Sequence, residues 1–93
     1  MQKLNDQELK DAVTKLPGWR LEEGKLLHDF SFADFVAAMA FVNKIADVAE
    51  SAGHHPDIDI RYNKVRLGLV THDAGGITAK DVEMAGRLSR STA

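Results

Sequence analysis

Residues 57–70, which decide the fold of this 93-residue chain, are DIDIRYNKVRLGLV. Apolar and polar side chains alternate on both sides of Asn63-Lys64, a pattern typical of two strands that each bury one face. The two intervening residues predict a tight hairpin, because Asn63 tolerates left-handed backbone angles. In this register Ile58 faces Leu69, and the apolar sides of the two strands match across the hairpin.

A second hairpin is predicted nearer the N-terminus, with short strands at residues 19–21 and 26–30. Residues 22–25 form its turn, in which Gly24 is free to take a positive φ. Tight hairpins join antiparallel strands, so the two hairpins together predict a four-stranded antiparallel sheet.

A long helix is predicted over residues 32–51, where apolar side chains recur every three or four positions. Ser31 is a good N-cap for it, and Asp34 then lies in the first turn, where a negative charge suits the helix dipole. Apolar side chains cover much of its circumference, so this helix needs more than one neighbour.

Two shorter helices are predicted near the chain ends, each opened by a capping pair three residues apart. The pairs are Asn5 with Glu8 for residues 5–15, and Thr78 with Asp81 for residues 79–90. The element order is therefore α-β-β-α-β-β-α. It predicts a single α+β domain over residues 1–93, a two-layer sandwich whose three helices cover one face of the sheet.

Composition limits the classes of partner. Twelve Lys and Arg against fourteen Asp and Glu give a net charge of −2, which offers no electrostatic reason to expect nucleic acid or an anionic membrane. The chain has no cysteine, which excludes disulfide and thiolate chemistry. We find no apolar signal region, and no apolar run approaches the roughly 18 residues of a membrane helix. A cytoplasmic protein is the default expectation.

Three of the four histidines fall close together in the predicted fold. Continuing the hairpin ladder beyond Pro56 places His55 opposite His72 and His54 opposite Asp73. The sequence therefore predicts three imidazoles and a carboxylate at one end of the sheet.

This cluster suits proton transfer, because imidazole gains and loses its proton near neutral pH. Two positioned histidines can serve as acid and base in one elimination. Asp73 is placed to orient one of them or to bind a donor on a substrate, and Gly75-Gly76 permits close approach of the backbone to a flat ligand. No other histidine is predicted beside His28, and we assign it to the strand surface.

Other interpretations of the cluster are weighed against this one. Histidines in loops are commonly solvated or capping residues, although an adjacent pair with a third nearby is less often so. Histidines with Asp73 suggest a zinc site, but adjacent strand residues point to opposite faces and no pair has helical i, i+4 spacing. We therefore expect no metal at this site, and a metal-binding protein stays the third hypothesis, which metal analysis of protein purified without chelators would decide. The glycine loop lacks a phosphate-binding pattern.

These motifs resemble the pterin-4a-carbinolamine dehydratases. In that family an acidic residue stands four before a histidine pair, an aromatic follows the proline, a third histidine comes about ten residues later, and an aspartate lies beyond it. Every spacing is met here, and the resemblance extends upstream over nearly the whole chain. The matching residues are Glu50, His54-His55-Pro56, Tyr62-Asn63-Lys64-Val65, Thr71-His72-Asp73, Gly76 and Asp81, with Gly18-Trp19 and residues 30–35 upstream.

The resemblance implies an enzyme that removes water from 4a-hydroxytetrahydropterin to give quinonoid dihydropterin, in the recycling of tetrahydrobiopterin, without metal or organic cofactor. It implies that His54 and His72 form the acid–base pair and that His55 binds and orients the pterin. The expected catalytic residues are thus His54, His55 and His72. The expected substrate-binding residues are Gly53, His54, His55, Pro56, Val70, Thr71, His72, Asp73 and Asp81.

Two positions depart from the family pattern. Relatives often carry Asn or Asp where this chain has Gly53, and an aromatic residue near Ile58. Both changes remove side-chain surface that a substrate would contact, while the three histidines are kept.

The resemblance also implies partners. Such proteins form dimers or tetramers, which suits the apolar long helix, and they act beside an aromatic amino-acid hydroxylase. Some relatives also serve as dimerisation cofactors for a transcription factor. A protein-interaction module is therefore the alternative function, and it would not need the histidines.

Overall fold

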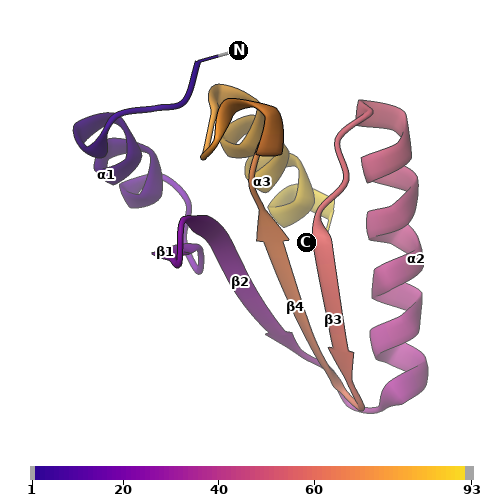
Figure 1. Cartoon of the computed structure of the whole chain (residues 1–93). Helices are drawn as coiled ribbons and strands as arrows, with labels where there is room; N and C mark the ends of the chain where they lie inside the picture. The colour runs from indigo at the N-terminus through magenta and orange to yellow at the C-terminus, as the bar shows by residue number, and fades with distance from the viewer. Residues whose placement is uncertain (1, 92–93) are drawn as a thin grey trace.

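A four-stranded antiparallel sheet and the helices packed on one of its faces form two layers (Figure 1). The computed structural model describes residues 2–91. The α+β order expected from the sequence is confirmed in this range. The elements are α1 (Asp6–Thr14), β1 (Arg20–Glu22), β2 (Lys25–Ser31), α2 (Phe35–Ala52), β3 (Asp57–Arg61), β4 (Lys64–Leu69), the short 3-10 helix η1 (His72–Ala74) and α3 (Ala79–Ser91).

The strands lie in the order β1-β2-β4-β3, so β4 is paired on both sides and β3 forms an edge. Alternation along β4 separates the two faces of the sheet: Val65, Leu67 and Leu69 are buried beneath the helices, whereas Lys64 and Arg66 lie on the open face. All five residues of β3 are exposed. The covered face of β4 is therefore the base of the core.

The register of the second hairpin differs from the prediction. Arg61 pairs with Lys64, so the turn residues are Tyr62-Asn63, and Ile58 faces Leu67 rather than Leu69. Asn63 is held in the turn by Phe32, whose backbone N–H donates to the Asn63 carbonyl (2.9 Å) while the Asn63 amide donates to the Phe32 carbonyl (2.8 Å). A shift of two residues keeps every side chain on its face, so alternation alone does not reveal the error.

The long helix begins later than expected. Ser31 belongs to β2, and the N-cap of α2 is Asp34, whose carboxylate accepts the backbone N–H of Ala37 (2.8 Å). The prediction of Ser31 as the cap is wrong because cross-strand pairing with Lys64 keeps Ser31 extended. Gly53 ends the helix with a left-handed φ of 67°.

The two shorter helices match their predicted starts. Asn5 and Glu8 form the expected capping box of α1, and Thr78 precedes α3. Met84, Ala85 and Leu88 of α3 are buried, together with residues of α2 and β4. No helix within residues 2–91 is long and apolar enough to cross a membrane.

His28 is not a strand-surface residue. Its half-buried ring stacks on Phe30, with centroids 3.9 Å apart, and meets the edge of Trp19 at 5.2 Å. The alternation of β2 is imperfect, so the sequence did not show which face His28 takes. The fourth histidine is therefore packed among core aromatics.

Candidate functional site

The site lies at the end of the sheet where α2 ends, β3 begins and the loop after β4 leads into α3 (upper end in Figure 1). His54 is central to it. It follows the Gly53 cap, and its backbone N–H donates to the Ala49 carbonyl (3.2 Å). Its side chain is only 12% exposed. The end of α2 thus points this imidazole inward.

The partner of His54 is Asp81 of α3. Its side chain is fully buried, and its Oδ1 lies 2.5 Å from the His54 Nε2. The second oxygen, Oδ2, accepts the Thr71 hydroxyl (2.8 Å) and the Thr78 backbone N–H (2.9 Å). Because Thr71 donates to Asp81, the Thr78 hydroxyl donates to Thr71 (2.9 Å). One carboxylate therefore positions the imidazole and caps the start of α3.

His55 and His72 have different surroundings. His55 is largely exposed, with its Nε2 3.0 Å from a carboxylate oxygen of Glu50, which lies in the last turn of α2. His72 opens η1 and is exposed, as is Asp73 beside it. Within residues 2–91, no hydrogen bond or ion pair joins His72 to either of the other two histidines.

The predicted opposition of His55 to His72 is wrong because it used the predicted hairpin register. The observed register, continued past Asp57, places His54 level with Thr71. The network agrees, since Asp81 bonds both His54 and Thr71. The three histidines share one end of the sheet, as expected, but the short contact is between His54 and Asp81.

The loop that carries His72 is tightly closed. Thr71 and Gly76 exchange backbone hydrogen bonds of 3.0 and 3.4 Å, and Gly75 takes a left-handed φ of 74°. This closure presents His72 and Asp73 to solvent. Of the remaining expected substrate-binding residues, Gly53 is exposed and Pro56 and Val70 are half-buried at the same end of the molecule.

A cavity of about 330 Å³ adjoins His54 on the side of α3. Its other lining residues are Ala52, Ala79, Lys80, Glu83, Met84 and Arg87. Neither His55 nor His72 lines it. Sequence reasoning did not find these α3 residues, although Lys80, Glu83 and Arg87 recur at steps of three and four and so share one helix face.

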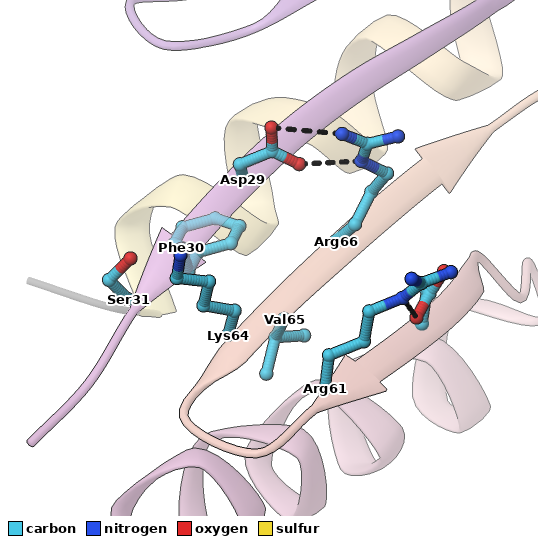
Figure 2. Close-up of a pocket in the computed structure, with 8 residues that line it drawn as sticks. Asp29, Phe30, Ser31, Arg61, Lys64, Val65 and Arg66 are labelled. Carbon is cyan, nitrogen blue, oxygen red and sulfur yellow. Dashed lines mark hydrogen bonds and ion pairs between the residues drawn. The ribbon is translucent and has the colours of Figure 1, made fainter. Parts of the chain in front are cut away.

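A larger hollow of about 500 Å³ lies on the open face of the sheet and contains no histidine (Figure 2). Its two carboxylates pair with arginines: Arg66 donates to both oxygens of Asp29 (2.7 and 3.3 Å), and Arg61 donates to Asp59 (3.2 Å). The hydrogen bonds from Arg66 lower the pKa of Asp29, and Arg20 adds to the effect. This hollow is a solvated sheet face with internal ion pairs.

Between residues 2 and 91, no three His, Cys, Asp or Glu side chains converge in a way that would hold an ion. The interaction of Asp81 with His54 also leaves that carboxylate buried behind the ring.

Comparison with known proteins agrees with the resemblance seen in the sequence. The family model described as pterin 4 alpha carbinolamine dehydratase matches residues 2–91. A protein of Acidobacterium capsulatum named "Putative pterin-4-alpha-carbinolamine dehydratase" is 53% identical over 95% of this chain and 96% of its own length. One of the same name from Trichormus variabilis is 54% identical, covering 96% of both chains.

Solved structures give the same fold. A transcriptional coactivator/pterin dehydratase from Brucella melitensis superposes with a TM-score of 0.92 at 31% identity, covering 99% of this chain and all of the other. A pterin dehydratase-like protein described as a RuBisCO assembly factor has a TM-score of 0.66 at 23% identity, covering 80% of this chain and 88% of the other, and so shows the fold alone. The family match and these identities establish that the chain belongs to the pterin 4 alpha carbinolamine dehydratase family.

Proposed function

We propose that this chain is a 4a-hydroxytetrahydropterin dehydratase that eliminates water to give quinonoid dihydropterin, in the recycling of tetrahydrobiopterin. Family membership supports the reaction class. The observation that carries the proposal is the His54–Asp81 pair, an imidazole fixed by a buried carboxylate. Such a pair is a recurrent way to hold a histidine in one orientation for proton transfer.

The reaction needs two proton transfers. The lone pair on N5 of the pterin expels the 4a-hydroxyl, the leaving oxygen takes a proton, and the N5 proton goes to a base. The 4a-hydroxyl and the proton that it takes leave as water, and the overall elimination involves no oxidant or reductant. We assign these transfers to His54 and His72, and a positioned acid or base of this kind typically contributes about 10²–10⁴-fold in rate.

The geometry supports Nδ1 of His54 as the nitrogen that does this work. Asp81 accepts the Thr71 hydroxyl and the Thr78 N–H, and a carboxylate that also accepts from His54 leaves the hydrogen on Nε2. Nδ1 is then the atom that accepts or donates the substrate proton. Asp81 acts here as a positioning residue for His54, whereas sequence reasoning expected it to touch the substrate.

Substrate binding is assigned to the surrounding residues. His55, steadied by Glu50, would orient the pterin. The closed loop that contains Thr71, His72 and Asp73 would supply backbone and side-chain contacts. Gly53, Pro56 and Val70 complete the proposed binding residues. We propose no metal or organic cofactor, since N5 itself supplies the electron pair.

The test is a kinetic assay in which a hydroxylase generates the carbinolamine and its decay is followed by ultraviolet absorbance. We expect the protein to accelerate the decay and His54→Gln to remove most of the acceleration, because glutamine keeps an amide beside Asp81 but transfers no proton. His28→Gln, which changes the histidine outside the site, is the matched control. Full activity in a His54→Gln, His72→Gln double variant would disprove the assignment.

We also propose a homo-oligomer, dimer or tetramer, in which a second copy covers the edge strand β3. Unpaired strand edges readily add another strand. The covered-face residues Ile58 and Ile60 of β3 are 38% and 36% exposed, and Phe35 and Val36 at the start of α2 are more exposed still. Asn63 ties the β3–β4 turn to Phe32, so the start of α2 lies near that turn.

A protein-interaction role is the second candidate, favoured by this apolar surface and by the Brucella melitensis relative, whose name includes transcriptional coactivator. The partner would be a transcription factor or a protein of the hydroxylase pathway. Affinity capture with the intact chain that recovers only the chain itself would rule this role out. A cytoplasmic location stays a prediction.

A further inference from the structure

A second hollow lies next to the cavity beside His54. It has a volume of about 270 Å³ and is lined by Val48, Arg87, Arg90 and Ser91. Arg87 lines both hollows, which therefore lie next to each other beside α2 and α3. From Lys80 to Ser91 the helix rises about 1.5 Å per residue, so the two hollows together extend over about 16 Å. We call the two hollows together the α2–α3 groove.

One end of this groove is the proposed catalytic histidine. The His54 side chain is only 12% exposed, and Asp81 covers its Nε2. The cavity adjoining the His54 ring is lined by the nearly buried Met84 and by the small side chains of Ala52 and Ala79. A ligand that reaches His54 from this side therefore has its remaining atoms directed along α3.

The groove is lined by more positive than negative charge. Lys80, Arg87 and Arg90 face a single carboxylate, Glu83. Within residues 2–91, none of these four side chains takes part in a hydrogen bond or an ion pair. The open sheet face differs, because its carboxylates Asp29 and Asp59 are bonded to arginines. Unpaired cations along a hollow raise the local concentration of anions.

We propose that the α2–α3 groove binds an anionic substituent on the pterin side chain, so that a pterin bearing phosphate or carboxylate binds more tightly than one with a neutral side chain such as that of tetrahydrobiopterin. Lys80 and Arg87 are the specificity-determining residues, with Arg90 at the far end. This inference rests on the proposed function for the placement of the pterin ring at His54. Phosphate and carboxylate share the chemistry that the groove recognises.

The experiment measures binding of three fluorescent pterins to the full chain at low salt: neopterin, which is neutral, neopterin monophosphate, and folic acid, which carries carboxylates. We expect the anionic pterins to bind about tenfold more tightly than neopterin, the effect of a few partly exposed ion pairs. The difference should shrink at high salt because exposed charges are screened. The ratio of the two anionic ligands separates phosphate from carboxylate as the preferred group.

Variants locate the effect. In a Lys80→Gln, Arg87→Gln double variant, the preference for neopterin monophosphate over neopterin should fall to about twofold or less. A Lys10→Gln, Lys64→Gln double variant removes the same charge from α1 and from the open sheet face, and should keep the preference. Equal binding of neutral and anionic pterins to the unaltered chain would overturn the inference, as would an undiminished preference in the groove variant.

The outcome is separable from that of the proposed function. The dehydratase assay uses a neutral substrate, the carbinolamine of tetrahydrobiopterin, and does not depend on charge in the groove. If the chain dehydrates the carbinolamine but binds neutral and anionic pterins equally, only the proposal for the groove is rejected. If it prefers anionic pterins but does not dehydrate the carbinolamine, the groove is retained as a pterin site and the proposed reaction is rejected.

Discussion

Asp81 is the residue on which the site and the last helix both depend. Its buried carboxylate receives His54 on one oxygen and Thr71 and the Thr78 N–H on the other. A buried charge is tolerated when its hydrogen-bonding capacity is filled in this way. The side chain that caps the start of α3 is therefore also the one that positions the proposed catalytic histidine.

The first prediction concerns this residue. In Asp81→Asn the side-chain shape is kept, but an amide no longer fixes the hydrogen on Nε2 of His54, so the productive tautomer is lost. We expect kcat to fall by about 10²-fold or more with little change in KM. Steady-state kinetics across a range of pH would show the loss together with an altered profile.

The control for that prediction is Asp81→Glu, which keeps the charge and should recover part of kcat. Circular dichroism would confirm that α3 still forms in each variant. A variant that folds with an unaltered kcat and pH profile would show that Asp81 serves the helix cap only.

At the scale of elements, the helix ends show where local signals suffice. The capping box at Asn5 and Glu8 is formed as its residues indicate, since both partners lie within one turn. The start of α2 was misplaced at Ser31 because two competent cap residues, Ser31 and Asp34, occur within a turn of one another. Pairing between β2 and β4 extends the strand through Ser31 and leaves Asp34 as the cap.

The second prediction compares two glycines, one with a left-handed backbone conformation and one with a helical backbone conformation. Gly53 has φ of +67° and open space around a new Cβ, so Gly53→Ala should lower the free energy of unfolding by about 1 kcal/mol, and Gly53→Asn by less. Gly86 lies within α3, where a Cβ meets only the mobile end of Arg90, so Gly86→Ala should raise it by about 0.5–1 kcal/mol. Denaturant titration measures all three, and equal effects at the two positions would contradict the assigned backbone conformations.

At the scale of the whole molecule, the open face of the sheet carries a set of ion pairs that join its strands. Arg20 and Arg66 flank Asp29 across β1, β2 and β4 (Figure 2 shows the Arg66 pair), and Lys25 pairs with Asp57 across the sheet. These pairs are exposed, so each contributes little by itself to the stability of the fold. They keep one face polar while the other is buried under the helices.

The third prediction follows from the lowered pKa of Asp29. The hydrogen bonds from Arg66, aided by Arg20, hold the folded-state pKa below the ordinary value of 3.8. The contribution of Asp29 to stability is therefore full above that value and is lost as the pH falls through the lowered pKa. Urea unfolding should show a larger difference between the unaltered chain and Asp29→Asn at pH 7 than at pH 3. The same comparison in an Arg66→Gln background should show a smaller pH dependence, and an equal one would contradict the pairing.

The fourth prediction concerns association. If a second copy covers β3, an Ile58→Lys, Ile60→Lys double variant should shift the chain to monomer, because two ammonium groups would be buried at the contact. Sedimentation velocity at several concentrations measures the change. Leu21→Lys, at a similarly exposed residue on the opposite edge strand, should leave the oligomer intact. An unchanged mass in the β3 variant would place the interface elsewhere.

The sequence by itself determined the element types, their order, the faces of β3 and β4 and the candidate histidines. These depend on alternation, helical periodicity and capping pairs, all of which act between residues near in the chain. Only the tertiary structure decided the hairpin register, which depends on Phe32 holding Asn63, and the meeting of His54 with Asp81 across 27 positions. A two-residue slip in register leaves every face unchanged, and a buried pair forms only when α2 and α3 pack together, so no local pattern contains either fact.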